Sequence, residues 1–168
     1  MVGTISHSAE VVTKDTLLLS HCQRDAFDTF FPGSFMIPRD HQLMALRPEI
    51  SQAVVTSTMA DEEIFQNQTL RPILKWQNEL LLSVFRHYAV LRKNVFFELP
   101  DDQRPLYITQ ALKQDAQLRH TLKGMVIGQF TLDEFARYAA MARALDKRML
   151  GLITQRLHGQ VAAIRLPD

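Results

Sequence analysis

The chain has 168 residues, of which 46% are hydrophobic and 22% are charged, and these values suit one compact soluble domain. The net charge of +1 is too small to imply nucleic-acid binding or strong electrostatic steering, and the single cysteine, Cys22, excludes an internal disulfide. No window approaches the roughly 20 apolar residues of a membrane span, and the amino terminus lacks the pattern of a secretory signal. We therefore expect one cytoplasmic domain over residues 1–168, with no membrane association.

The first helix of the chain is predicted to end at Phe30. Residues 1–12 are expected to be flexible, and Thr13 can cap a helix whose apolar residues recur at helical spacing. The alternative is a partly extended conformation over residues 10–19. Pro32 and the glycine after it end the element in either case.

A second helix is predicted over residues 41–56. Asp40 can accept hydrogen bonds from the first free N–H groups of this helix, so it is the expected cap. Pro48 lacks an N–H group and should kink or shorten the helix. The residues expected to face inward are Leu43, Met44, Leu46, Ile50, Ala53 and Val54.

The longest apolar stretch is a central helix predicted over residues 69–94. A helix that is apolar on several sides needs neighbours on several sides, so the other helices are expected to surround it. Acidic residues 61–63 suit the start of a preceding helix, which we expect to continue into the central one with a bend at Pro72. A separate helix starting at Thr69 is the alternative. The apolar residues are Ile73, Leu74, Trp76, Leu80, Leu81, Leu82, Val84, Phe85, Tyr88, Ala89, Val90 and Leu91.

Two shorter helices are predicted after a turn at residues 93–100. The first covers residues 101–115 and starts at one of two aspartates, and the second covers residues 115–130. Gly124 and Gly128 lie on one face of the second helix. Glycines inside a helix cost about 1 kcal/mol each relative to alanine, which favours close packing of another backbone at this place.

Thr131 and Glu134 have the spacing of a capping box, which marks the start of a last helix over residues 132–157. Residues 160–168 form an apolar tail that can pack back on the domain or exchange with a second copy. The pattern gives five or six helices and no clear strand. The predicted fold is therefore all-α, a single-domain antiparallel helical bundle.

Two blocks of sequence and one short motif carry a resemblance to other proteins. They are residues 63–80, E-I-F-Q-N-Q-T-L-R-P-I-L-K-W-Q-N-E-L, residues 118–131, L-R-H-T-L-K-G-M-V-I-G-Q-F-T, and D-K-R-M near the end. Over about residues 40–158 the chain resembles a group of small all-helical bacterial proteins without an established function, some of which bear a glyoxalase label. Glyoxalase I enzymes hold their metal on curved β-strands, and this chain offers no such strands. The resemblance thus implies an all-helical cytoplasmic protein and no site residue.

Motifs for metal binding or nucleophilic catalysis are missing from the sequence. It contains no Glu-x-x-His, His-x-x-x-His or Cys-x-x-Cys, and its six histidines are scattered. His21 and Cys22 would point about 100° apart on a helix, so they do not form a catalytic pair. Cys22 on an apolar stripe is typical of a small core residue. We expect no metal and no cofactor, and the balance is against an enzyme.

Polar side chains interrupt the central helix and the segment before it, and buried amides must find partners. Under one interpretation, the amides bind backbone groups that Pro72 frees, while the cations are solvated. Under the other, the polar residues surround a small pocket beside the Pro72 bend, where Lys123 holds an anionic ligand. The residues of this candidate site are Gln66, Asn67, Arg71, Lys75, Gln77, Lys123, Gln129 and Arg148.

Three hypotheses for function follow. The first is a non-enzymatic protein that acts through association, most simply as a homodimer, because its apolar surface exceeds what a small bundle hides. The second is a small-molecule binding protein or enzyme with the pocket near Pro72. The third, a nucleic-acid-associated regulator, is disfavoured because acidic residues interrupt the basic side of the last helix. The surplus apolar residues are Phe30, Phe31, Phe35, Phe96, Phe97 and the tail, and the basic residues are Arg137, Arg143, Lys147, Arg148 and Arg156.

Overall fold

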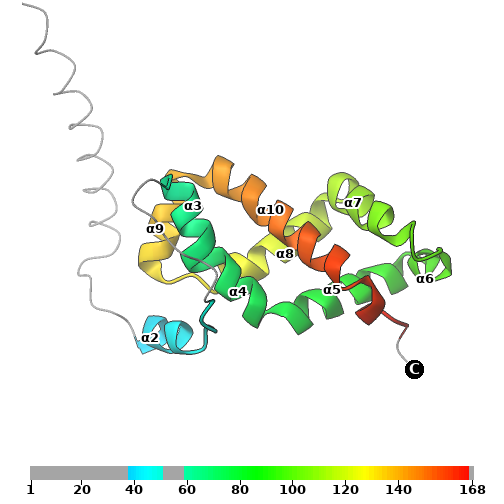
Figure 1. Cartoon of the computed structure of the whole chain (residues 1–168), viewed down its shortest axis with the longest axis horizontal. Coiled ribbons are helices and arrows are strands. Elements are labelled where there is room, and N and C mark those ends of the chain that lie inside the picture. Colours follow the sequence, from blue (N-terminus) through cyan, green and yellow to red (C-terminus); the bar gives the residue numbers. More distant parts are fainter. Residues whose placement is uncertain (1–37, 51–58, 167–168) are drawn as a thin grey trace, which may run out of the picture. The chain divides into compact units, whose positions relative to one another are not determined.

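The computed structural model describes residues 38–50 and 59–166, and every regular element in these two ranges is helical (Figure 1). The predicted all-α class is confirmed for this part of the chain. The predictions for residues 1–37, including the helix that ends at Phe30 and the role of Cys22, lie outside it. The described helices are shorter and more numerous than the five or six expected, because irregular residues divide two of the long ones.

Helix α2 (Pro38–Ala45) ends earlier than predicted. Residues 46–50 are not helical, because Pro48 disfavours helical geometry in the residue before it and cannot donate a backbone hydrogen bond. The predicted helix over residues 41–56 is therefore wrong in this part, and residues 51–56 lie outside the described ranges. Asp40 lies inside α2 rather than capping it, and its Oδ2 accepts a hydrogen bond from the Leu132 N–H at 3.0 Å.

The central segment follows a nearly continuous helical path with two irregularities. Pro72 has no N–H group to bond the carbonyl four residues earlier, and the backbone adapts with a π-turn in which the Arg71 N–H bonds the Gln66 carbonyl. The irregularity predicted at Pro72 is thus present as a π-turn just before it. Gln77 (φ −82°, ψ 8°) forms the second irregularity. The pieces are α3 (Asp61–Phe65), the π-helix (Gln66–Leu70), α4 (Arg71–Trp76) and α5 (Asn78–Leu91).

The remaining helices are α6 (Val95–Glu98), α7 (Arg104–Gln114), α8 (Ala116–Ile127), α9 (Leu132–Ala140), α10 (Ala142–Gly159) and a short 3₁₀-helix (Val161–Ala163). The aspartates at 101 and 102 do not cap α7, which begins at Arg104. Asp115 does cap α8, because its Oδ1 accepts a hydrogen bond from the Leu118 N–H at 3.0 Å. A single last helix over residues 132–157 was expected and is wrong, since the chain leaves helical geometry at Met141 (φ −125°, ψ 22°).

Helix α10 is in contact with α4, α5, α7, α8 and α9, as its place in Figure 1 suggests. It contributes four fully buried residues to a single apolar core: Leu145, Met149, Ile153 and Leu157. Phe96 is also fully buried, in an edge-to-face contact with Phe85 at 5.4 Å between ring centroids. Phe97 packs against the same core, so the prediction that these two phenylalanines add surplus apolar surface is wrong. The tail packs back through Ile164, which is buried.

A buried ion pair fastens the segment after α2 to the start of α9. The Arg47 guanidinium donates to the two carboxylate oxygens of Glu134 at 2.5 and 2.7 Å and to the Gln129 carbonyl at 2.6 Å. The Arg47 and Glu134 side chains are only 6% and 12% exposed. Thr131 and Glu134 form the predicted capping box, and the Thr69 hydroxyl donates to Glu134 Oε1 at 3.0 Å. The Glu134 carboxylate therefore connects three parts of the chain, namely the residues after α2, the π-helix and the start of α9.

The two glycines of α8 do not serve helix packing. Gly124 is exposed, and a Cβ atom added there would meet nothing within 4 Å. Gly128 is the carboxyl-terminal cap of α8, and its carbonyl accepts a hydrogen bond from Arg39 at 2.7 Å. The prediction that a neighbouring backbone approaches this face is therefore wrong.

Candidate functional site

The polar residues that the sequence singles out do not meet in one place. Arg71 and Lys75, one turn apart on α4, line an open hollow of about 380 Å³ together with Arg156 of α10. Leu74 of α4 and Leu152 of α10 also line the hollow. This hollow is close to Pro72 in the sequence, and it brings together three cationic side chains from two helices.

Gln66 and Arg148 form a second, separate contact, in which the Arg148 guanidinium donates to Gln66 Oε1 at 3.2 Å. Asn67 donates to the Met59 sulfur at 3.9 Å. In the described residues, the amides of Gln66 and Asn67 thus bind side chains, while the π-turn itself accommodates Pro72. The interpretation in which these amides bind the backbone freed by Pro72 is not what the structure contains.

Lys123 pairs with Asp146 of α10 instead of facing a ligand. The Tyr138 hydroxyl donates to the other oxygen of the same carboxylate at 2.7 Å. Burial and the Asp146 hydrogen bond raise the pKa of Tyr138 to about 12. Burial alone would raise the pKa of Asp146, but the hydrogen bonds from Lys123 and Tyr138 outweigh it and lower that pKa. The positive charge of Lys123 is therefore already balanced.

Two candidate amides remain. Gln77 is buried at the junction of α4 and α5. The Oε1 atom of Gln129 is buried in the turn before α9 and has no hydrogen-bond partner among the described residues. Of the eight residues of the candidate site, the structure brings together Gln66 with Arg148 and Arg71 with Lys75, and it places the other four elsewhere.

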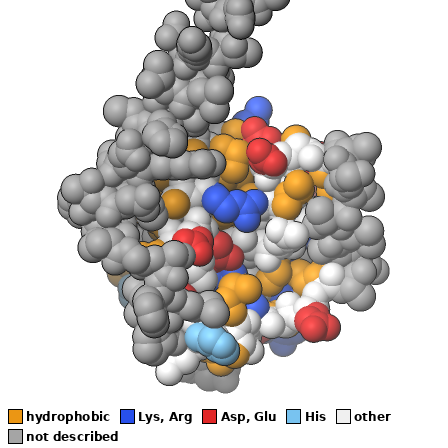
Figure 2. Space-filling view, turned by 90° about the vertical axis from the view of Figure 1, so that its left-hand side faces the viewer, with side chains coloured by type: hydrophobic (Ala, Val, Ile, Leu, Met, Phe, Trp, Pro, Cys, Tyr) orange, Lys and Arg blue, Asp and Glu red, His pale blue; other side chains and the backbone are white. Residues whose placement is uncertain are grey.

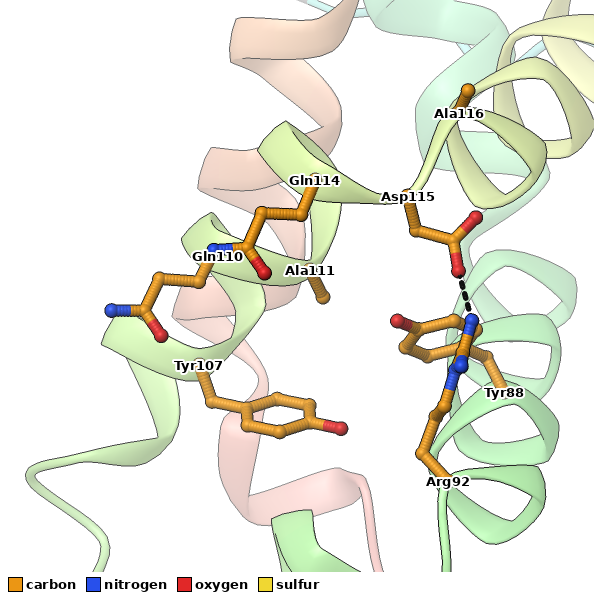
Figure 3. Close-up of a pocket in the computed structure, with 8 residues that line it drawn as sticks. All are labelled: Tyr88, Arg92, Tyr107, Gln110, Ala111, Gln114, Asp115 and Ala116. Atoms are coloured by element: carbon orange, nitrogen blue, oxygen red, sulfur yellow. Dashed lines mark hydrogen bonds and ion pairs between the residues drawn. The ribbon is translucent and has the colours of Figure 1, made fainter.

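Sequence reasoning missed a hollow of about 430 Å³ between α5 and α7 (Figure 3). Tyr107 points its hydroxyl across this hollow toward Tyr88 and Arg92 (Figure 3). The Arg92 guanidinium lies 5.3 Å from the centre of the Tyr88 ring and donates to Asp115 at 2.5 Å. Because Asp115 neutralises Arg92, the hollow offers polar but charge-balanced walls. Its residues are far apart in the sequence, and no local pattern marks them.

An exposed apolar stripe is the second feature that the sequence did not reveal. We call it the α4–α5 face and define it by Trp76, Leu80 and Leu91, whose spacing keeps them on one side of the helical path, with the half-buried Val84 between them. Trp76, Leu80 and Leu91 are 37%, 53% and 68% exposed. The expectation that the central helix has neighbours on several sides and lies inside a bundle is therefore not met on this side.

Val84 and Leu91 also border a hollow of about 340 Å³ between α5 and α8. His87 of α5 and Leu118 of α8 line the same hollow. The exposed stripe thus has a partly exposed tryptophan near one end and a concave region near the other.

The basic side chains of the last two helices serve different contacts. Arg137 lies over the Phe65 ring at 5.4 Å, Arg148 binds Gln66, and Arg156 lines the α4–α10 hollow. Figure 2 shows the face over α3 and α9, where basic and acidic side chains lie beside one another among hydrophobic ones. Such a mixed surface does not have the single-sign field that attracts phosphate backbones.

Within the described residues, no group of three or more histidine, cysteine or acidic side chains is arranged to hold a metal ion. None of the helices described is both long and apolar enough to cross a bilayer. Comparisons with known protein families, with curated proteins and with solved structures found no match for this chain.

Proposed function

We propose that this chain acts by associating with a second copy of itself through the α4–α5 face, as a non-enzymatic cytoplasmic protein. The observation that supports this proposal is the exposed row of Trp76, Leu80 and Leu91 on a helical path whose other side is buried. Exposed apolar side chains gathered in one stripe mark association surfaces, whereas single exposed ones need no explanation.

An antiparallel arrangement of two α5 helices suits the shape of this face. A two-fold axis near Ser83 would place the Trp76 ring of each copy beside the concave region next to Leu91 of the other. In a two-fold interface, every contact that residue i makes to residue j occurs twice. One tryptophan and one hollow per chain therefore give two such contacts, one at each end of the paired helices.

Charge on the edge of the face favours the same arrangement. Glu79 and Arg86 are seven residues apart and therefore lie on the same side of α5, about two turns from each other. In an antiparallel pair centred near Ser83, Glu79 of one copy lies opposite Arg86 of the other. Arg86 takes part in none of the ion pairs between described residues, so its guanidinium is available to a carboxylate of the second copy.

Leu80→Glu tests the face against a matched control, Leu106→Glu on α7. The two leucines are 53% and 58% exposed, so both substitutions place a carboxylate at a comparably wet position. Burying a leucine side chain completely contributes ~2 kcal/mol, and about half of this remains to be gained when the dimer covers Leu80. Leu80→Glu removes this contribution from both copies. Dimerisation should weaken by about 30-fold or more in Leu80→Glu and stay unchanged in Leu106→Glu, as measured by sedimentation over a concentration series. A wild-type chain that is monomeric at every concentration refutes the proposal, and so does equal weakening in the two variants.

A charge exchange tests the direction of the helices. Glu79→Arg should weaken the dimer, because it sets a second guanidinium against Arg86 at two places, and adding Arg86→Glu should restore it. In a parallel pair, each residue faces the same residue of the second copy, so the double variant would not recover dimerisation. Failure of the double variant to recover therefore removes the antiparallel arrangement even if a dimer exists.

A further inference from the structure

Among the described residues, the α4–α10 hollow collects positive charge without a balancing carboxylate. Arg71 and Lys75 of α4 and Arg156 of α10 line it, and none of its described lining residues is acidic. None of the three takes part in an ion pair with another described residue. Lys123 and Arg47, in contrast, are each paired with a carboxylate. Like charges that share a hollow repel one another, and an anion that enters it relieves this repulsion.

The shape of the hollow suits an organic molecule better than a bare ion. Its volume of about 380 Å³ lies within the range of known ligand pockets, roughly 300–1,000 Å³. Leu74 and Leu152 give it an apolar patch, and Gly159 at the end of α10 has no side chain to fill the space. A Cβ atom at Gly159 would meet nothing within 4 Å among the described residues, so a side chain can be added there.

One wall is held in place before any ligand arrives. The Gln160 amide, which borders the hollow, makes two reciprocal hydrogen bonds with the Asn78 amide, at 2.9 and 2.8 Å. This pair joins the end of α10 to the start of α5. Since α4 precedes α5 directly, the pair also limits movement of α4 against α10, the two helices that carry the cations.

We propose that the α4–α10 hollow binds a small organic phosphate. Two guanidinium groups, on Arg71 and Arg156, can each donate two parallel hydrogen bonds to phosphate oxygens, and Lys75 adds a point charge. A phosphomonoester carries a charge of about −1.5 to −2 near neutral pH, which matches several cations better than a single carboxylate does. The organic part of the ligand lies on Leu74 and Leu152. This site is independent of the α4–α5 face.

Phenyl phosphate is the first probe, because it joins a phosphate to an apolar body, and inorganic phosphate and phenol test the two halves. Calorimetry with the full chain should give a dissociation constant of about 1 mM or below for phenyl phosphate. Inorganic phosphate should bind at least tenfold more weakly, and phenol should not bind measurably.

Arg156→Glu and Arg143→Glu form a matched pair, because both lie on α10 and both change the net charge equally, yet only Arg156 borders the hollow. Phenyl phosphate binding should weaken at least tenfold in Arg156→Glu and less than twofold in Arg143→Glu. Gly159→Phe, which fills the space without a change of charge, should weaken it as well. Circular dichroism tests whether each variant is folded. If Arg156→Glu is unfolded, Arg156→Gln replaces it in the binding measurement.

Equal weakening in the two charge variants would overturn the proposal, since it would mean general attraction rather than a site. The absence of phenyl phosphate binding at millimolar concentration would overturn it too. A single-stranded oligonucleotide that binds more tightly than phenyl phosphate and responds equally to both variants would assign the charge to a diffuse nucleic-acid surface instead.

Discussion

Thr69→Val removes one hydrogen bond from the buried carboxylate of Glu134 while keeping the shape of the side chain. Thr69 is 2% exposed and donates to Glu134 Oε1 at 3.0 Å. The carboxylate keeps its hydrogen bonds from Arg47 and from the Thr131 N–H, so no charge is left unpaired. The substitution therefore isolates the contribution of a single hydroxyl donor.

A hydrogen bond to a charged group contributes about 1.5–3 kcal/mol to stability. Because Arg47 still binds the same oxygen of Glu134, we expect a loss near the lower end, about 1.5 kcal/mol. For a chain of this size, 1 kcal/mol corresponds to about 2–4 °C in melting temperature, so Tm should fall by about 3–6 °C. Urea unfolding followed by circular dichroism measures the same loss as a change in free energy.

The background variant Glu134→Ala provides the decisive control. Without the Glu134 carboxylate, the Thr69 hydroxyl has lost its acceptor. In this background, Thr69→Val should therefore change the free energy of unfolding by close to nothing. A loss below about 0.5 kcal/mol in the otherwise native chain would refute the reasoning, because surface substitutions without a partner give changes of that size. An equal loss in both backgrounds would also refute it, since the effect would then be unrelated to Glu134.

The effect of Thr69→Val should depend on pH. Burial raises the pKa of Glu134, but the hydrogen bonds from Arg47, Thr131 and Thr69 outweigh burial and hold the pKa below its ordinary value. A carboxyl with a lowered folded-state pKa stabilises the fold above its unfolded pKa of about 4.3, and this contribution is lost as pH falls through the folded pKa. The difference between Thr69→Val and the native chain should therefore shrink in acid. A difference that grows as pH falls would contradict this sign.

Gly124→Ala should stabilise the chain by up to about 1 kcal/mol, whereas Gly128→Ala should not, because a Cβ at Gly128 would lie 3.2 Å from the Gly124 carbonyl oxygen; equal melting temperatures would contradict the expectation. Tyr138 has its folded-state pKa raised to about 12, so its contribution is complete below the unfolded pKa near 10 and is lost as pH rises through 12. Tyr138→Phe should be less stable at pH 8 and should lose less stability between pH 10 and 12, and parallel curves would argue against this. Ser83→Cys, with the native cysteine replaced by serine, should form a disulfide-linked dimer under mild oxidation, because Ser83 lies at the proposed axis; Gln110→Cys should not.

Local sequence patterns predicted the features that depend on neighbouring residues. Thr131 and Glu134 form the expected capping box because both partners lie within one helical turn. Pro72 marks an irregular turn because its ring removes one specific backbone hydrogen bond. Helical spacing also placed Leu81 and Phe85 in the core. The break at Met141 has no proline or glycine to mark it, which is why one last helix was expected.

The candidate sites depend on contacts that the sequence does not encode locally. Arg71 and Arg156 line one hollow only because α4 and α10 are in contact, and the Arg47–Glu134 pair joins residues that are 87 positions apart. Lys123 was a candidate for anion binding, yet Asp146 of another helix balances its charge. Whether a cation is available for a ligand depends on which carboxylate comes within reach, and that is a property of packing.

By itself, the sequence determined that the described chain is helical and which local signals start its helices, since propensity, caps and proline act over a few residues. Only the tertiary structure decided which side of the helical path stays exposed. Trp76, Leu80 and Leu91 have the same apolar character as buried Leu81 and Phe85, and periodicity assigned all of them to a surrounded helix. The difference arises because neighbouring helices cover one side of α5 and leave the other open, and that arrangement is set by the packing of residues far apart in the chain.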